Sequence, residues 1–211
     1  MPGVYPPQED TWLLASVLRS VSVGPRTRVL DLCTGTGALA VCAAEQGAGR
    51  VTAVDISRRA LVSAWANVAV RRRSLVLRRG DLLTPVRDER FDLVVSNPPY
   101  VPAAEATLPG GGIARAWDAG RDGRALLDRI CMQAPEVLAD HGALLLVQSV
   151  LSDVEKTYIM LEEQGLRVEI AAQQTIAFGK VLMARRSMLE NMRLIEPGQR
   201  SEEIVVLRAT Q

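Results

Sequence analysis

The sequence is poor in residues that cross-link a chain or bind metals, since its 211 residues include three cysteines and one histidine. Cys33, Cys42 and Cys131 form neither a C-x-x-C pair nor the spacing of zinc ligands, which indicates reduced thiols and no metal site. No apolar run approaches the roughly 18 residues that a membrane helix needs, and the first residues lack a basic stretch followed by an apolar one. These absences predict a cytoplasmic protein without membrane contact.

An excess of charge of either sign is also missing, because 25 lysines and arginines face 24 aspartates and glutamates, for a net charge of +1. A domain that follows a phosphate backbone usually carries a clear basic excess, so a nucleic acid is the second choice of partner. With 48% apolar residues, the length predicts a single domain over residues 1–211 that can bury a core without cross-links.

Apolar strand-like segments alternate with helix-like segments through most of the chain. Residues 1–20 are expected to form a helical lead-in, in which Asp10-Thr11 caps a helix start. Such alternation, with strands that are apolar almost throughout, is typical of an α/β protein with a parallel sheet covered on both faces. We expect strands at residues 28–33, 51–55, 75–77, 91–96 and 143–148, and helices at about 38–45, 58–70 and 123–138.

The C-terminal part has a different pattern. Residues 166–170 and 204–208 are strand-like but far apart, which predicts a final antiparallel hairpin with residues 172–203 inserted between its strands. Seven apolar residues of the insertion fall at helical spacing, and we interpret them as core-facing, with a substrate or partner surface as the alternative. They are Phe178, Val181, Leu182, Met188, Leu189, Met192 and Ile195.

A glycine-rich turn follows the first predicted strand. Gly35-x-Gly37-x-x-Ala40 satisfies the dinucleotide fingerprint, and Asp55 lies 20 residues after Gly35, at the end of the second strand. Glycines let a ligand approach the backbone, and a carboxylate at the second strand's end can accept the two ribose hydroxyls. This pattern is shared by proteins that bind NAD and proteins that bind S-adenosylmethionine, so it leaves both open.

Two further carboxylates favour S-adenosylmethionine. Asp31 would repel a pyrophosphate at the helix N-terminus, but it suits a ligand end that carries an ammonium and a sulfonium. Asp81 follows the third strand, where it could accept from an adenine amino group, with Leu82 beside the ring. Each Asp alone could simply cap a loop, whereas three at the ends of successive strands favour a ligand. Cys33 and Ile56 are predicted to line the same site.

The motif Asn97-Pro98-Pro99-Tyr100 directly follows the strand at 91–96. An Asn-Pro pair often marks only a turn, but this one falls at the carboxyl end of a central strand, where such sheets bind ligands. Together with the glycine turn, the motif resembles that of the class I S-adenosylmethionine-dependent methyltransferases of the HemK type, which methylate glutamine side chains. The resemblance implies a doubly wound, Rossmann-like seven-stranded sheet, mostly parallel, with a C-terminal antiparallel hairpin.

The motif suits methylation of a planar nitrogen, whose delocalised lone pair makes it a poor nucleophile. The Asn97 side-chain oxygen and the Pro98 carbonyl could each accept one of its N–H bonds and aim the lone pair at the methyl group. Tyr100 could stack on the planar group, and the prolines, Pro99 included, stiffen the loop. No general base is needed. The single histidine, His141, is expected in a turn.

Two more segments are similar to the short branch of this family, which lacks the N-terminal helical domain of the long enzymes. They are residues 5–14, in which the family's matching threonine (Thr11 here) touches the cofactor, and residues 116–129. The resemblance implies S-adenosylmethionine as cofactor, contacted also by Asn97. It further implies a protein substrate with an exposed glutamine, such as a release factor. Adenine N6 or guanine N2 of a nucleic acid is the second candidate acceptor, and an NAD-binding or non-catalytic module is a further alternative.

The short branch also works with a small zinc-binding activator that adds to the sheet beside the third strand, here residues 75–77. Five arginines, at positions 71–73, 78 and 79, flank that strand. We interpret them as a solvated face that protects an edge strand, with a nucleic-acid contact as the alternative. We therefore expect no requirement for the activator, and a homodimer remains open.

Overall fold

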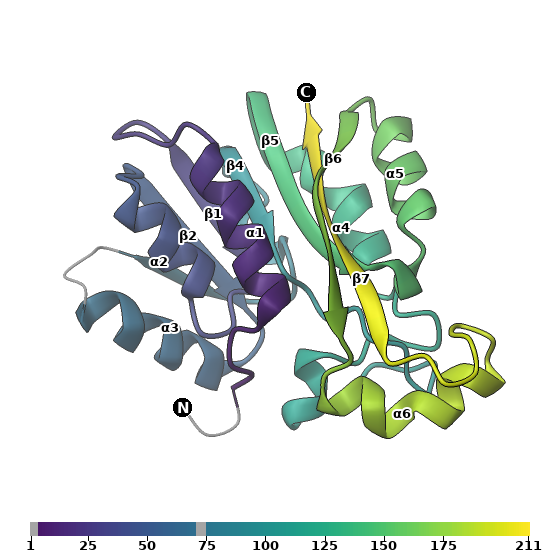
Figure 1. Ribbon diagram of the computed structural model, residues 1–211. Coiled ribbons are helices and arrows are strands. Elements are labelled where there is room, and N and C mark those ends of the chain that lie inside the picture. The colour runs from purple at the N-terminus through teal and green to yellow at the C-terminus, as the bar shows by residue number, and fades with distance from the viewer. Residues whose placement is uncertain (1–3, 71–74) are drawn as a thin grey trace.

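The computed structural model describes residues 4–70 and 75–211, and its centre is a seven-stranded sheet (Figure 1). The strand order is β3-β2-β1-β4-β5-β7-β6. Strands β1 to β5 run parallel to one another, while β7 is antiparallel to both β5 and β6. This confirms the predicted α/β, doubly wound fold with its antiparallel end. The strands are β1 (Arg28–Leu32), β2 (Arg50–Asp55), β3 (Val76–Arg79), β4 (Phe91–Ser96), β5 (Leu138–Ser149), β6 (Arg167–Ala177) and β7 (Ser201–Thr210).

Six α-helices in the described ranges surround the sheet. Helices α1, α2 and α3 pack against one another on one face, and α4 and α5 pack together on the other (Figure 1). Helix α6 lies between β6 and β7 in the sequence and beyond the end of their hairpin in space. The helices are α1 (Glu9–Ser20), α2 (Ala38–Glu45), α3 (Arg58–Val70), α4 (Leu127–Gln133), α5 (Val154–Glu163) and α6 (Lys180–Asn191). No helix in the described part of the chain is long and apolar enough to cross a membrane.

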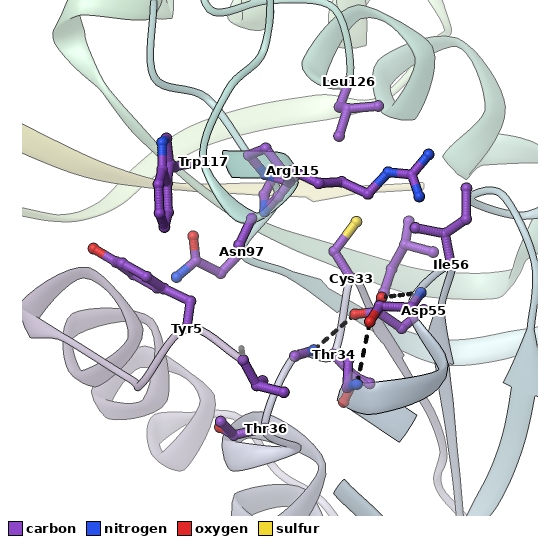
Figure 2. Close-up of a pocket in the computed structure, with 18 of the residues that line it drawn as sticks. Tyr5, Cys33, Thr34, Thr36, Asp55, Ile56, Asn97, Arg115, Trp117 and Leu126 are labelled. Atoms are coloured by element: carbon purple, nitrogen blue, oxygen red, sulfur yellow. Dashed lines mark hydrogen bonds between the residues drawn. The ribbon is translucent and has the colours of Figure 1, made fainter. Parts of the chain in front are cut away.

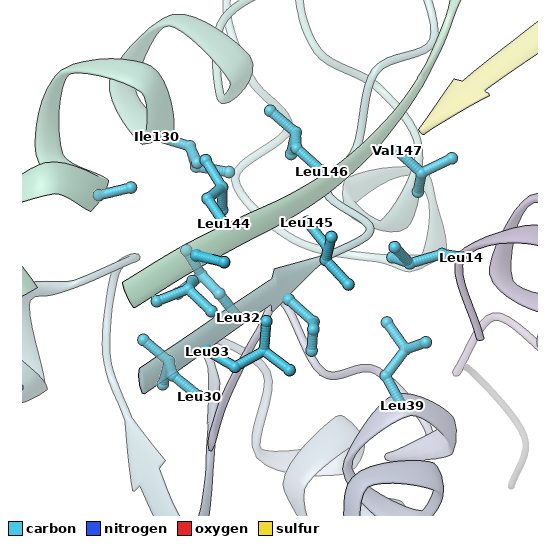
Figure 3. Close-up of a cluster of buried hydrophobic side chains, with 14 of the residues drawn as sticks. Leu14, Leu30, Leu32, Leu39, Leu93, Ile130, Leu144, Leu145, Leu146 and Val147 are labelled. Carbon is cyan, nitrogen blue, oxygen red and sulfur yellow. The ribbon is translucent and has the colours of Figure 1, made fainter. Parts of the chain in front are cut away.

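The core explains why the central strands are apolar without alternation. In β5, Leu144 and Leu146 lie on the side of Ile130, whereas Leu145 and Val147 lie on the side of α1 (Figure 3). All of these side chains are fully buried. A parallel strand that is covered by helices on both faces buries every residue. The continuous apolar run at residues 143–148 therefore correctly predicted a central strand.

The segment before β5 differs from the prediction. The helix expected at 123–138 is shorter at both ends, because α4 spans only Leu127–Gln133 and a 3₁₀ turn over Ala134–Val137 follows, with a proline in its first turn. Strand β5 then begins at Leu138 and includes the predicted turn around His141. His141 has a φ of 62° and lies where the β4–β5 register shifts. The polar triplet therefore makes a bulge inside a strand rather than a turn before it.

The C-terminal hairpin is longer than predicted. Because β6 extends to Ala177 and β7 begins at Ser201, the proposed insertion over 172–203 shortens to residues 178–200, which contain α6. Four residues of the apolar stripe are buried in a second cluster that contacts Val101 and Leu151. The core-facing interpretation holds for them, and Val181, Met188 and Met192 are half-buried. The four are Phe178, Leu182, Leu189 and Ile195.

Strands β3 and β6 are the two edges of the sheet. Arg78 and Arg79 on β3 are exposed, in keeping with a solvated face. The arginines at 71–73 lie outside the described residues.

Candidate active site

A cavity of about 710 Å³ opens at the carboxyl ends of β1, β2 and β4. Its size is within the range of small-molecule sites, and it lies where the strand order reverses, between β1 and β4. Six stretches of chain contribute to its wall (Figure 2). They fall within residues 4–11, 32–39, 54–60, 79–82, 97–101 and 108–118. Leu126, which precedes α4, and Arg129 of α4 complete the lining.

Asp55 connects the ends of β1 and β2 at the floor of the cavity. Its Oδ2 accepts from the Gly35 amide at 3.0 Å, and its Oδ1 accepts from the Ser57 amide at 2.8 Å (Figure 2). Burial raises the pKa of Asp55, and these two hydrogen bonds oppose that shift. The positive φ of Gly35, 53°, is a conformation that glycine adopts without strain. The predicted pair is thus brought together and lines the cavity.

Cys33 and Ile56 line the cavity as well, on either side of Asp55 (Figure 2). Burial raises the pKa of the Cys33 thiol well above its usual range. A thiol that stays protonated is a poor nucleophile, so this side chain acts as lining.

Asp31 and Gly37 do not reach the cavity. Asp31 is fully buried behind the loop, where its Oδ2 accepts from Thr34 Oγ1 at 2.6 Å and from the Ala40 amide at 2.9 Å. Gly37 is the N-cap residue before α2 and has a φ of 79°, and a Cβ there would lie 2.8 Å from the Cβ of Ala64 on α3. Through Oδ2, Asp31 holds the shape of the glycine loop, while its buried Oδ1 has no hydrogen-bond partner among the described residues. Gly37 permits the close contact of two helices.

Asp81 and Leu82 line the cavity beyond β3. Asp81 is half exposed and accepts from Arg129 Nη2 at 2.7 Å, an ion pair that the sequence did not indicate. Leu82 is buried with a φ of 47°.

Asn97 follows β4 and faces α1 across the cavity. Its Nδ2 donates to Asp10 Oδ2 and to Thr11 Oγ1, both at 3.0 Å. Pro98 and Pro99 continue the wall. The asparagine nitrogen is thus fully engaged by the first turn of α1, and its amide oxygen is left facing the cavity.

Tyr100 anchors the motif at its other end. Its hydroxyl donates to Asp10 Oδ2 at 2.8 Å, and its backbone carbonyl accepts from Ser152 Oγ at 2.6 Å. The ring is 8% exposed, and burial raises the pKa of its phenol well above the usual value. Gly123 packs directly on that carbonyl: a Cβ on it would lie 2.3 Å from the Tyr100 oxygen.

The structure adds site residues that sequence reasoning missed. Asp10 was interpreted as a helix cap, but α1 begins at Glu9, and the Asp10 carboxylate contacts the Asn97 motif instead. Tyr5 and Trp117 form a tilted aromatic pair with ring centroids 5.6 Å apart, and Asn97 lies beside both (Figure 2). Arg115 extends over Cys33 (Figure 2). Tyr5, Asp10 and Trp117 belong to the segments at 5–14 and 116–129, which resemble the short branch of the family. That resemblance was the signal from which they could have been predicted as site residues.

Helix α6 supports the wall that holds Trp117. Arg185 of α6 pairs with Asp118 at 2.6 Å and donates to the Pro102 carbonyl at 3.0 Å. The apolar cluster below α6 contacts Val101. The segment at 178–200 is therefore part of the scaffold of the site.

Glu202 is a second buried acid near Asp10, and it predicts a pH dependence. Burial raises its pKa to about 7, against about 4.3 for an unperturbed glutamate. Between these values the folded protein holds a proton that the unfolded chain has lost, so the free energy of unfolding falls as the pH rises. We expect Glu202→Gln to flatten this dependence between pH 5 and 7 by up to about 1.4 kcal/mol per pH unit. Denaturant titrations at several pH values measure it. Glu203→Gln is the matched control, and an unchanged slope in Glu202→Gln would contradict the assignment.

The comparisons with known proteins agree with this arrangement. A family model described as the methyltransferase small domain matches residues 6–109. A protein of Methanocaldococcus jannaschii named as a protein N5-glutamine methyltransferase is 32% identical over 182 residues, which cover 86% of this chain and 90% of the relative. The release factor glutamine methyltransferase of Streptomyces coelicolor is 33% identical, and the ribosomal protein uL3 glutamine methyltransferase of Bradyrhizobium diazoefficiens 46%. The matches cover 78% and 56% of this chain and span 62% and 39% of those two enzymes.

Solved structures give the same result for the fold. A chain of the E. cuniculi Mtq2–Trm112 complex, which methylates the eRF1 termination factor, superposes with a TM-score of 0.69 at 25% identity, and the match covers 99% of each chain. The T. thermophilus 16S rRNA N2 G1207 methyltransferase, solved with AdoMet and guanosine, has a TM-score of 0.62 at 21% identity, with 100% of this chain and 46% of that one covered. That second likeness concerns the fold alone.

Fold, site and relatives together define a class I methyltransferase that uses S-adenosylmethionine. Within that class, the chain belongs to the HemK-type family of glutamine methyltransferases. This confirms the resemblance carried by the motif at 97–100 and decides against the NAD-binding and non-catalytic alternatives.

Proposed function

We propose that this protein methylates the side-chain amide of a glutamine in another protein, through the residues that line the cavity. The observation that carries the proposal is the Asn97 amide, whose nitrogen is held by α1 so that its oxygen faces the cavity. A glutamine amide carries two N–H donors on a planar nitrogen. An oriented carbonyl oxygen at that point is the acceptor such a nitrogen needs.

The other half of the cavity fits the methyl donor. We assign the ribose to Asp55, whose oxygens keep acceptor capacity beyond the two backbone bonds they already receive. Ile56 and Leu82 provide apolar surface for the adenine, and Asp81 an acceptor for its amino group. Thr11, Cys33 and Gly35 line the path towards Asn97. The donor supplies a methyl group on a sulfonium, which is a good leaving group for in-line attack.

The protein's own contribution is to orient the acceptor nitrogen. Asn97 Oδ1 and the Pro98 carbonyl each accept one N–H bond, so that the lone pair points at the methyl carbon. As the N–C bond forms, positive charge develops on the nitrogen, and both oxygens stabilise it. The nitrogen then gives up a proton to solvent. Tyr5 and Trp117 flank Asn97 and offer apolar faces for the methylene groups of a glutamine.

Charge supports a protein acceptor over a nucleobase. On the acceptor side of the cavity, Asp118 is paired with Arg185, and Asp10 is a buried carboxylate. Arg115 is the one basic residue that the stretch at 108–118 adds to the cavity lining, whereas a domain that follows a phosphate chain usually carries a clear basic excess. The relatives named for release factor and ribosomal protein methylation support the same class of substrate and a cytoplasmic reaction.

The test is transfer of tritiated methyl groups from S-adenosylmethionine into a cell lysate, followed by protease or nuclease. Protein-bound label that is recovered as N5-methylglutamine after gentle enzymatic digestion is expected. Label that disappears with nuclease and persists with protease would replace glutamine by a nucleobase as the acceptor.

Loss of the Asp55 carboxylate is expected to weaken cofactor binding. Asp55→Ala removes charged hydrogen bonds worth about 1.5–3 kcal/mol, so the Kd rises roughly 10- to 150-fold. Calorimetric titration with S-adenosylhomocysteine measures this, and Asp88→Ala, at an exposed position away from the cavity, is the control. A Kd within twofold of the parent would remove Asp55 from the binding site.

We expect the chain to fold and bind cofactor without a zinc-binding activator. The β3 edge, where such a protein would add a strand, is short and carries the exposed Arg78 and Arg79. Expression of the chain alone, followed by light scattering and a cofactor titration, tests this and also reports the oligomeric state. Aggregated protein that becomes soluble only with a co-expressed zinc protein would contradict it.

A further inference from the structure

Asp10 is a buried carboxylate in the first turn of α1 that makes no salt bridge within the described ranges 4–70 and 75–211. It is 9% exposed. Burial of an unpaired carboxylate is costly unless several donors surround it. Its role is therefore to be sought in the donors that it holds.

Each Asp10 oxygen has its own set of donors. Oδ1 accepts from the Thr11 amide at 2.6 Å and from the Thr11 hydroxyl at 3.3 Å. Oδ2 accepts from Asn97 Nδ2 at 3.0 Å and from the Tyr100 hydroxyl at 2.8 Å. One carboxylate thus receives donors from both ends of the Asn97–Tyr100 motif.

An ionised carboxylate can only accept hydrogen bonds, so it admits one orientation of the Asn97 amide. The amide nitrogen must face Asp10, and the amide oxygen must then face away from it. In Figure 2 the Asn97 oxygen lies towards Trp117 and its nitrogen towards Tyr5. With the amide inverted, two oxygens would meet at hydrogen-bond distance in a buried site, and the cavity would present a donor to the acceptor nitrogen.

We propose that Asp10 is a positioning residue, which acts through Asn97 by fixing the amide so that its oxygen receives the N–H of the methyl acceptor. This inference rests on the proposed function for its acceptor. Its structural content, the orientation of the Asn97 amide, can be tested without any acceptor. The charge of Asp10 also polarises the amide and strengthens its oxygen as an acceptor.

Asp10→Asn is the sharpest variant, because it keeps the shape and removes the charge. The new amide must place an NH2 at one of the two oxygen positions. At Oδ1 it would oppose the fixed backbone N–H of Thr11, whereas at Oδ2 it meets Tyr100 and Asn97, both of which can rearrange. The Tyr100 hydroxyl can accept, and the Asn97 amide can turn over. We therefore expect the variant to invert Asn97.

The kinetic expectation separates positioning from binding. In Asp10→Asn, kcat should fall by about 10²-fold, similar to the loss of one preorganised hydrogen bond in a transition state, while the Kd for S-adenosylhomocysteine changes less than threefold. The double variant Asp10→Asn/Asn97→Ala should be no slower than Asn97→Ala alone, because Asp10 acts through that side chain. Glu9→Gln, exposed in the same turn, is the matched control. A parental kcat in Asp10→Asn, or multiplied losses in the double variant, would overturn the proposal.

A nuclear magnetic resonance measurement on the free protein needs no acceptor and no variant activity. In the parent, the side-chain NH2 protons of Asn97 should show proximity to Thr11 and Tyr100, and this proximity should vanish in Asp10→Asn. If that variant does not fold, the parent spectrum alone decides, since an Asn97 NH2 directed into the cavity would overturn the proposal. If the parent transfers methyl groups to something other than glutamine, the proposed function fails while the spectrum still tests Asp10.

Discussion

Replacing Asn97 with alanine is expected to lower turnover by about 10²- to 10³-fold, because it removes one of the two oxygens that we propose to hold the acceptor nitrogen. The size follows from the loss of one donor in an oxyanion hole, where a preorganised partner for developing charge is withdrawn. Cofactor affinity should change much less, since we assign the ribose and the adenine to residues at the ends of β1 and β2 and after β3. Steady-state rates at saturating cofactor, with a parallel cofactor titration, separate the two effects.

The control for this substitution is Asn191→Ala, at an exposed position at the end of α6. It should retain the parental rate. An Asn97→Ala enzyme with near-parental turnover would make Asn97 a structural residue and would remove the mechanism proposed above. A loss confined to KM would instead indicate that Asn97 binds the acceptor equally in the ground state and the transition state.

Gly123→Ala is expected to lower the free energy of unfolding by about 2–5 kcal/mol. The residue has a φ of 72°, which costs an alanine about 1–2 kcal/mol. The added Cβ would also lie 2.3 Å from the Tyr100 carbonyl and 2.6 Å from Ser152 Oγ, where overpacking adds about 1–3 kcal/mol. Relief requires movement of the Tyr100 backbone, so turnover should fall together with stability.

Thermal unfolding measures this effect, since 1 kcal/mol corresponds to a Tm shift of about 2–4 °C for a chain of this size. Gly24→Ala is the control, because a Cβ there meets nothing within 4 Å and its φ is not positive. Equal Tm values for the two variants would show that the backbone at residue 123 relaxes freely. The Asn97 motif would then not depend on this contact.

The order of elements was predictable because apolar strands and glycine turns are local signals. Leu144–Val147 reads as a buried strand from composition alone, and its burial on both faces agrees. The errors lie where long-range contacts decide. The triplet Asp140-His141-Gly142 is typical of a turn, but because it lies opposite β4 it forms a bulge within β5. β6 runs on to Ala177 because β7 pairs along its whole length, which local sequence does not encode.

Site residues were predictable where they directly follow a strand, because the position of the strand in the sheet then fixes the position of the residue. Asp55 and Asn97 lie at strand ends, and parallel strands bring those ends together. Asp31 was predicted to contact the cofactor, and it lies outside the cavity lining, because the sequence cannot tell a side chain that lines a cavity from one that holds its own loop. Asp10 was missed for the complementary reason: its partner lies 87 residues away, and only the docking of α1 brings the two together.

The position of β7 affects the order in which the protein becomes active during synthesis. Residues 201–210 form an interior strand between β5 and β6, and they leave the ribosome after every other strand. Until they emerge, β6 has no neighbouring strand in the sheet. The C-terminal end of α6 is then not yet connected to a strand of the sheet. Because α6 supports the wall that carries Trp117, that wall depends on the strand that is synthesised last, whereas the lining residues assigned to the cofactor all lie before residue 100. The acceptor side is completed only when translation reaches the last strand.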